Sequence, residues 1–233
     1  MDLMCHSPAA RPPLPPIRGG STDDHDLVLT AADGNRLAAY AVRAAEPTGA
    51  GIVVMPDVRG LHPFYKDLAR RFAQAGVDAV AIDYFGRTAG VSQHAEGFDF
   101  MGHVRQTTVQ SVFTVGFCFG GSQSWRQSAG QPGLSGAIGL YGRPAAARDA
   151  IPAMRAPLLL LVAGADAATS QEEADAFDRD LTQAGIPHRR VVYQGAPHSF
   201  FDRTFDQYRA QSDDAWRQML AFIKENTRQP TPA

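Results

Sequence analysis

The sequence predicts a single α/β domain with a mainly parallel sheet and helices on both faces. Three observations predict it. Apolar strand-like runs alternate along the chain with segments of helical period, an alternation typical of parallel sheets with crossover helices. Some runs, such as Ile52–Met55, are continuously apolar, as in strands that are buried on both faces. The length of 233 residues and the hydrophobic content of 44% suit one domain with a large core.

The elements follow in order along the chain. The first two expected strands, residues 27–30 and 36–42, flank Asp33-Gly34-Asn35, which is a hairpin signal. The other expected strands cover residues 52–55, 77–82, 112–115, 136–140, 158–162 and 190–193. The expected helices cover residues 63–75, 119–129, 171–184 and about 205–225, and glycines 76 and 185 end two of them. Because only fifteen residues lie between Tyr141 and Pro157, no separate cap domain fits there.

The two ends of the chain differ in composition from this domain. Residues 1–22 are expected to form a flexible arm, rich in proline and glycine, and residues 229–233 a flexible tail. The domain itself is expected to cover residues 23–228. The first residues have neither the cationic start nor the apolar stretch of a secretory signal.

Composition and charge exclude several classes of protein. The net charge of −2 gives no basic footprint, so no nucleic acid partner is expected. No apolar run approaches the ~18 residues of a membrane span. The histidines share no metal-ligand spacing, and neither a metal nor a cofactor is expected. The two cysteines, Cys5 and Cys118, indicate no disulfide framework, and a free nucleophilic thiol requires a reducing compartment, so a cytoplasmic protein is expected.

The most informative motif follows the expected strand at residues 112–115. Residues Gly116–Gly121 read GFCFGG, the form of a nucleophile elbow, G-x-S-x-G, with Cys118 in the serine position. The turn is so tight that a Cβ at the flanking positions would clash, and the helix dipole favours a thiolate there. Alternatively, Cys118 is a small buried side chain at a tight junction.

Two further residues favour the catalytic alternative. Asp166 follows the apolar strand at 158–162, and His198 follows the strand at 190–193. All three candidates therefore lie just past the carboxyl ends of predicted strands. Their order, nucleophile, acid and histidine, is the chain order of α/β-hydrolases.

From about residue 27 to residue 225 the sequence resembles the dienelactone hydrolase family, cysteine hydrolases with the α/β-hydrolase fold. The segments that carry the resemblance are Gly116–Gly121, Leu140–Gly142, Gly164–Asp166 and Gly195–Phe200. The resemblance implies that Cys118 is the nucleophile, His198 the general base and acid, and Asp166 the group that orients the imidazole. These residue types suit acyl transfer through a thioester, since a thiolate attacks the acyl carbon and an imidazole moves the protons.

The resemblance also implies an oxyanion hole and a proton acceptor. The backbone N–H groups of Phe119, which the elbow geometry also supplies, and of Val58 would hold the oxyanion. Asp57 occupies the position of a family glutamate that accepts the thiol proton. Alternatively, Asp57 caps the helix that follows it.

Substrate recognition is expected to involve arginines and aromatic residues. Arg87 matches a family arginine that holds a substrate carboxylate; the alternative is an exposed loop arginine. A second family arginine would fall near Asp202, and this chain has Arg203 one place later. Arg59 either substitutes for it or lies on the surface. The aromatic residues expected in the pocket are Phe85, Tyr141, Phe200 and Phe201, with core packing as the default for the last two.

The crossover between Asp83 and Val112 is short for the family. It holds 28 residues, of which about half read as polar loop, although a dozen or so suffice for a crossover. Either a disordered stretch near residues 105–111 is missing from the sequence, or a true deletion leaves apolar sheet surface that a second subunit covers. The protein is accordingly expected to be a monomer or a homodimer.

The sequence thus favours a cofactor-independent hydrolase of small carboxylic esters or lactones. Two alternatives remain open. One is a catalytically silent binding protein in which Cys118 only packs. The other is a redox-sensing thiol protein, because an exposed thiolate is oxidisable.

Overall fold

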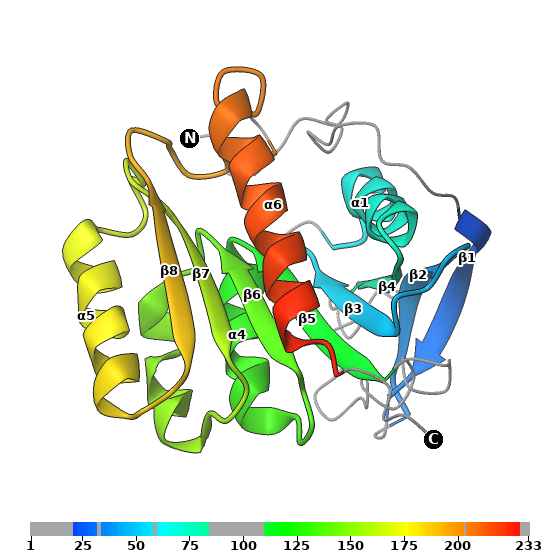
Figure 1. Cartoon of the computed structure of the whole chain (residues 1–233), viewed down its shortest axis with the longest axis horizontal. Coiled ribbons are helices and arrows are strands. Elements are labelled where there is room, and N and C mark those ends of the chain that lie inside the picture. The colour runs from blue at the N-terminus through cyan, green and yellow to red at the C-terminus, as the bar shows by residue number, and fades with distance from the viewer. Residues whose placement is uncertain (1–20, 32–33, 58–59, 84–109, 203, 229–233) are drawn as a thin grey trace.

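A computed structural model describes residues 21–31, 34–57, 60–83, 110–202 and 204–228. Its centre is one eight-stranded sheet with the strand order β1-β2-β4-β3-β5-β6-β7-β8 (Figure 1). The strands are β1 (Ser21–Thr30), β2 (Arg36–Ala44), β3 (Ala50–Met55), β4 (Val77–Ile82), β5 (Ser111–Phe117), β6 (Gly136–Leu140), β7 (Leu158–Ala163) and β8 (His188–Tyr193).

The sheet is mainly parallel, as the sequence predicts. β1 and β2 form the expected antiparallel hairpin, and β2 is antiparallel to β4. The remaining neighbours pair in parallel. Strands β3, β4, β5 and β6 are buried along their whole length, which agrees with their mostly apolar sequences.

Helices cover both faces of the sheet. α1 (Pro63–Gln74) and α6 (Arg209–Asn226) lie on the face toward the viewer in Figure 1, with α4 (Phe119–Gly130) behind the sheet. The first core cluster packs residues of α1 and α6 against one face, and the rings of Phe72 and Trp216 meet at 4.9 Å between centroids. The second cluster packs α4 and α5 (Gln171–Gln183) against the other face through Trp125 and Phe177.

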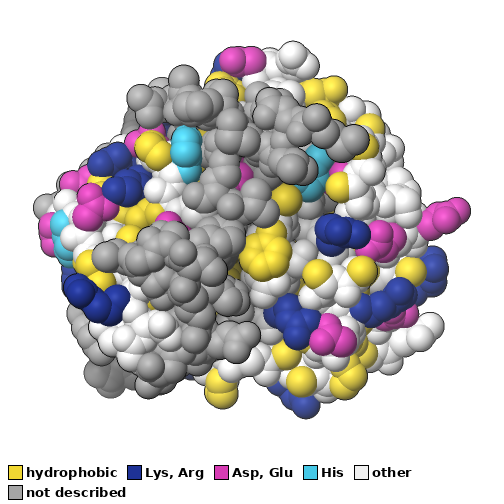
Figure 2. Space-filling view, turned by 180° about the vertical axis from the view of Figure 1, so that it is seen from behind, with side chains coloured by type: hydrophobic (Ala, Val, Ile, Leu, Met, Phe, Trp, Pro, Cys, Tyr) yellow, Lys and Arg dark blue, Asp and Glu magenta, His cyan; other side chains and the backbone are white. Residues whose placement is uncertain are grey.

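Between β6 and β7 the chain forms only two 3-10 helices, η1 (Pro144–Ala146) and η2 (Arg148–Ala153). Here the connection is too short for a cap domain, as expected. Across the back of the molecule, Lys and Arg side chains lie among Asp and Glu side chains wherever side chains are coloured (Figure 2). One such ion pair on the surface joins Arg148 and Asp180, at 2.5 Å between Nε and Oδ2.

Local sequence explains where two helices begin and one ends. α1 begins after His62, whose ring accepts the N–H of Phe64, and α5 begins after Ser170, whose hydroxyl accepts the N–H of Glu173. α1 ends before Gly76, at φ 84°, where a Cβ would lie 2.9 Å from the carbonyl oxygen of Glu46. Glycine is therefore needed at this position.

Some predictions fall outside the described residues and some boundaries were wrong. The first strand begins at Ser21 rather than at residue 27, because its pairing with β2 continues back to Ser21 opposite Ala44. The final helix begins at Arg209 rather than near residue 205, because residues 204–208 form a turn closed by bonds from the N–H of Tyr208 to the carbonyls of Thr204 and Phe205. The crossover at 84–109, most of the proline-rich arm and the tail lie outside the described part. Within the described part, no helix combines the length and the apolar character that a membrane span requires.

Candidate active site

The junction between β5 and α4 is a strained turn centred on Cys118. Cys118 has φ 55° and ψ −116°. Residues other than glycine rarely adopt this backbone conformation. A Cβ on Gly116 would lie 1.9 Å from the carbonyl oxygen of Gly120, and one on Gly121 would lie 2.7 Å from that of Leu140. The glycines of the motif are therefore sterically required, as the sequence predicts for a nucleophile elbow.

Cys118 packs against the first core cluster and is partly exposed. Partial exposure is what a nucleophile requires, whereas a cysteine that only packs requires none. The N–H of Cys118 donates to the carbonyl of Leu140 at 3.1 Å, so the elbow is fixed to the end of β6. Phe119, the first residue of α4, is 36% exposed. The thiol and an aromatic ring thus stand together at the positive end of a helix dipole.

Asp166 and His198 are brought together although 32 residues separate them in the sequence. Oδ2 of Asp166 and Nδ1 of His198 are 2.7 Å apart. The Asp166 side chain is 2% exposed and that of His198 is 23% exposed. The other carboxylate oxygen of Asp166 accepts the N–H of Ala168 at 2.7 Å. Both oxygens are therefore held in place, and one of them fixes the imidazole.

Backbone bonds join the loops that carry these two residues. The N–H of Gly164 donates to the carbonyl of Tyr193 and that of Ala165 to the carbonyl of Ala196, each at 2.9 Å. A Cβ on Gly164 would lie 2.6 Å from the same Tyr193 oxygen. The acid loop after β7 and the histidine loop after β8 therefore form one unit at the carboxyl edge of the sheet.

Tyr141 contacts the histidine rather than standing free in a pocket. Its ring lies 5.0 Å from the His198 ring between centroids, at an interplanar angle of 58°. Its hydroxyl donates to Oδ2 of Asp202 at 2.7 Å. The side chains of Tyr141 and Asp202 are 2% and 1% exposed. Asp202 is thus connected to the histidine by way of Tyr141, which bonds Asp202 and packs against His198. No local motif indicated Asp202 as a residue of this site.

Phe200 and Phe201 follow the default expectation of core packing. Phe200 and Phe201 are fully buried in the first core cluster, and this burial favours core packing over a place in the substrate pocket. Ser199, between them and His198, has φ 63°. The loop thus turns sharply after the histidine and returns the chain to the core.

The turn after β3 is held by side chains on both sides. The N–H of Asp57 donates to the hydroxyl of Tyr65 at 3.0 Å, and that of Leu61 donates to Oδ2 of Asp83 at 3.1 Å. A Cβ on Gly60, at φ 70°, would lie 2.6 Å from the Asp83 carboxylate. The turn expected to supply the oxyanion donor is therefore fixed at both ends.

Asp57 is fully buried. The alternative in which it caps the next helix was wrong, because His62 occupies the cap position and bonds the N–H of Phe64. Of the other predicted site residues, Val58, Arg59, Phe85, Arg87 and Arg203 lie outside the described part of the chain. No group of three or more His, Cys, Asp or Glu residues with the geometry of a metal site occurs in the described part.

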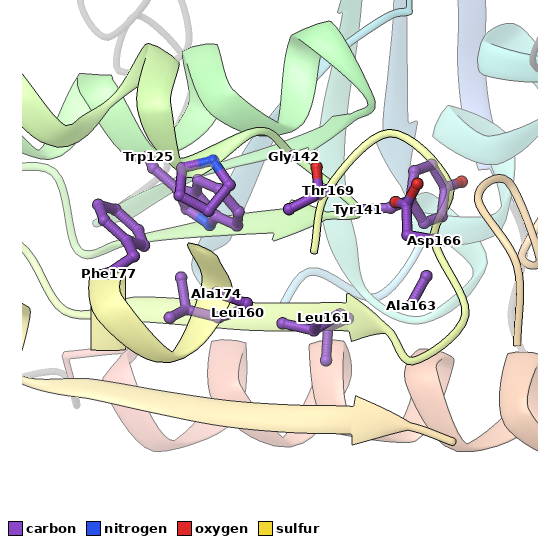
Figure 3. Close-up of a pocket in the computed structure, with 12 residues that line it drawn as sticks. Trp125, Tyr141, Gly142, Leu160, Leu161, Ala163, Asp166, Thr169, Ala174 and Phe177 are labelled. Carbon is purple, nitrogen blue, oxygen red and sulfur yellow. The ribbon is translucent and has the colours of Figure 1, made fainter. Parts of the chain in front are cut away.

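Two cavities lie in the described part of the chain, and Cys118 lines neither of them. A cavity with about 10 Å³ of space, roughly one water molecule, runs beneath the acid loop, with Trp125 and Phe177 at one end and Tyr141 and Asp166 at the other (Figure 3). A larger cavity of about 470 Å³ lies between the ends of α1 and α6, lined by Thr48, Ala75, Val77, Leu220, Ile223, Lys224 and Thr227. This one lies at the amino edge of the sheet, opposite the Asp166–His198 pair.

Comparison with known proteins agrees with this geometry. The sequence model of the dienelactone hydrolase family matches residues 37–113 and 99–227. This chain belongs to the dienelactone hydrolase family. Together the two matches cover residues 37–227 of this dienelactone hydrolase family member.

A carboxymethylenebutenolidase of Rhodococcus opacus is 27% identical over 255 aligned positions, covering 95% of this chain and 96% of its own. Among solved structures, a bacterial brefeldin A esterase superposes with a TM-score of 0.72 at 15% identity, covering 91% of this chain and 79% of its own. An esterase of Pyrococcus furiosus superposes with a TM-score of 0.70 at 14% identity, covering 94% and 98%. The expected α/β-hydrolase fold is therefore confirmed, and the protein is a carboxylic-ester hydrolase of the dienelactone hydrolase family.

Proposed function

We propose that this protein hydrolyses small carboxylic esters or lactones, dienelactone-like, with Cys118 as nucleophile, His198 as general base and acid, and Asp166 as the residue that orients His198. The observation that carries the proposal is the 2.7 Å contact between Asp166 and Nδ1 of His198. It stands at the same edge of the sheet as a strained, partly exposed cysteine. A histidine held in this way presents Nε2 as its reactive nitrogen.

The reaction has two halves. In the first, the Cys118 thiolate attacks the acyl carbon, the carbonyl π electrons move to oxygen, and collapse of the oxyanion expels the alcohol or enolate, which takes a proton from His198. In the second, His198 removes a proton from water, which attacks the thioester carbon. Collapse of this second oxyanion releases the carboxylic acid and restores the thiolate.

Two backbone donors would stabilise each oxyanion. The N–H of Phe119 is one, because it begins α4 directly after the nucleophile. The N–H of Val58 is the other, in the turn that Tyr65 and Asp83 hold at its two ends. The loss of one such donor typically costs about 3 kcal/mol of transition-state stabilisation.

Asp57 is proposed to accept the thiol proton before substrate binds. Its full burial and its freedom from the capping role support this assignment. Asp57 is one methylene shorter than the family glutamate, so the test is the rate at which iodoacetamide alkylates Cys118. Asp57→Asn should slow alkylation at neutral pH if Asp57 assists deprotonation, and an unchanged rate would contradict this role.

The substrate is proposed to be small, with a group that suits an aromatic contact. Phe119, which follows the nucleophile in the sequence, is exposed, and Arg87, Arg59, Arg203 and Phe85 are proposed to complete recognition. A thiol nucleophile needs a reducing compartment, so the cytoplasm is the proposed location, with the protein acting as a monomer or homodimer.

Turnover of p-nitrophenyl acetate and of a dienelactone tests the proposal. We expect hydrolysis of both, abolished by iodoacetamide and by Cys118→Ala. Turnover that survives Cys118→Ala would contradict the thiol mechanism. Tight binding of an ester without turnover would favour the silent binding protein, and peroxide consumption coupled to a second thiol would favour the redox sensor.

A further inference from the structure

The His198 ring is in contact with the Tyr141 ring. The ring centroids are 5.0 Å apart and the rings are inclined at 58°. Asp166 bonds the same imidazole through Nδ1. The histidine is therefore held by two groups, a carboxylate at Nδ1 and an aromatic ring packed against the imidazole.

Tyr141 is itself held at both ends. Its N–H donates to the carbonyl of Leu161 at 2.9 Å, and its hydroxyl donates to Asp202 at 2.7 Å. Its backbone has φ 39°, a strained conformation that persists only where the surroundings fix it. Hydrogen bonds to a charged group contribute more than neutral ones, so the bond to Asp202 is a strong candidate for what fixes the ring.

Asp202 lies on the histidine loop itself, four residues after His198. Its N–H donates to the carbonyl of Ser199 at 3.2 Å, and its side chain is 1% exposed. The loop thus carries both the histidine and the carboxylate that holds the ring against it. Tyr141 connects this loop to the end of β6, next to the strand that leads to Cys118.

We infer that Tyr141, anchored by Asp202, is a positioning residue that holds the imidazole of His198 at the angle needed to exchange protons with Cys118 and with the leaving group. This inference rests on the proposed function. A single hydrogen bond at Nδ1 fixes one point of the ring but permits rotation about that contact, and the Tyr141 ring restricts this rotation. Misplacement of a reacting group by about 1 Å can cost 10²-fold in rate.

This role makes a different prediction from a place in the substrate pocket. A residue that contacts substrate changes KM when it is altered, whereas a residue that positions the histidine changes kcat. Both halves of the reaction use His198, so both acylation and deacylation should slow together. Such equal slowing leaves KM almost unchanged.

The test uses four single variants of the full chain and one double variant, Tyr141→Phe with Asp202→Leu. Tyr141→Phe keeps the ring and removes the hydroxyl bond, Asp202→Leu removes the acceptor, and Asp202→Asn keeps an acceptor oxygen. The matched control is Tyr193→Phe, because the Tyr193 hydroxyl donates to Asp214 at 3.0 Å in the same kind of bond. The Tyr193 ring packs against Phe200, at 4.9 Å between centroids. Thermal unfolding first establishes that each variant is folded.

We expect Tyr141→Phe and Asp202→Leu to lower kcat for p-nitrophenyl acetate by about tenfold with little change in KM. The double variant should be no slower than the slower single variant, because both remove the same bond. Asp202→Asn should recover most of the loss, and Tyr193→Phe should leave kcat unchanged. A second readout, independent of turnover, is the proton NMR resonance of the His198 Nδ1–H, which should broaden or shift in Tyr141→Phe and not in Tyr193→Phe.

An effect on KM alone, additive losses in the double variant, or an unaltered Nδ1–H resonance would overturn the inference. Failure of the proposed function has a different signature, since the unaltered protein would then not turn over the ester. In that event the NMR comparison still decides whether Tyr141 positions the imidazole.

Discussion

The two loops that would carry the nucleophile and the base are built in opposite ways. The elbow at Gly116–Gly121 is shaped by its own backbone, since added Cβ atoms would meet main-chain atoms of the elbow and of β6. The histidine loop at Gln194–Asp202 is shaped by distant side chains, namely Asp166, Tyr141 and Ser212. Ser212 belongs to α6 and donates from its hydroxyl to the carbonyl of Phe200.

This difference teaches where each loop is vulnerable. The elbow has no tolerance for added atoms, because the space is filled by backbone that cannot rotate away. The histidine loop tolerates local change better but depends on a few hydrogen bonds, each replaceable and each separately measurable. Substitutions in the two regions should therefore fail in different ways, one by loss of folding and the other by loss of turnover.

The largest effect is expected from Gly116→Ala. Its Cβ would lie 1.9 Å from the carbonyl oxygen of Gly120, so the variant should lose more than about 3 kcal/mol of unfolding free energy and all activity. Urea unfolding measures the change in unfolding free energy. The control is Gly130→Ala at the end of α4, where a Cβ meets nothing within 4 Å. If Gly116→Ala were as stable as Gly130→Ala, the steric account of the elbow would be wrong.

Asp166→Asn should leave the fold intact and remove most turnover. The amide no longer stabilises an imidazolium and can favour the wrong tautomer of His198, which we expect to lower kcat on the order of 10²–10⁴-fold. Steady-state kinetics measures the loss, with circular dichroism to check folding. A matched control is Asp178→Asn, since Asp178 bonds Nε2 of His188 at 3.2 Å in another Asp–His pair. Equal kcat values for the two variants would contradict the role of Asp166.

Ser212→Ala should have a smaller effect on the same loop. The buried Ser212 hydroxyl bonds the carbonyl of Phe200 at 3.1 Å, and its removal should cost about 1 kcal/mol of unfolding free energy with a modest fall in kcat. Thr182→Ala is the control, because the exposed Thr182 hydroxyl bonds only within its own helix. A loss no larger than in the control would mean that the loop does not depend on α6.

The smallest effect concerns alkaline pH. Burial, with the nearby Asp214 carboxylate, raises the pKa of Tyr193 above its usual value of 10.0. Because the folded pKa is raised, the stabilisation by the protonated hydroxyl is complete below about pH 10 and is lost as the pH rises above it. Burial also raises the pKa of Tyr40, to about 12, at the other end of the sheet. Tyr193→Phe should flatten the fall in unfolding free energy between about pH 10 and 12, and an unchanged slope would contradict the assignment.

Much of this fold could be predicted because its signals are local. Strands β4 and β6 lie at the predicted residues, since short, mostly apolar runs mark them. The elbow was predictable for the same reason, because its steric demand falls on neighbouring positions. The pairing of Asp166 with His198 followed from their places after consecutive parallel strands.

What could not be predicted depends on contacts between distant residues. The bond from Tyr141 to Asp202 spans 61 residues, and no local pattern in the sequence predicts that these two residues pair. Tyr141 and Ser199 both have positive φ angles. Because neither position is a glycine, the sequence did not indicate this conformation. His62 rather than Asp57 caps the N-terminus of α1. Both residues carry a hydrogen-bond acceptor before the helix, so the sequence alone did not show which of them is the cap.

The covalent intermediate tests the central claim most directly. Turnover of p-nitrophenyl acetate is quenched with acid during the burst, and the digested protein is analysed by mass spectrometry. The account predicts a single acetyl group on the peptide that contains Cys118, absent in Cys118→Ala and after iodoacetamide treatment. Ester turnover with the acetyl group on another residue, or undiminished turnover by Cys118→Ala, would contradict it.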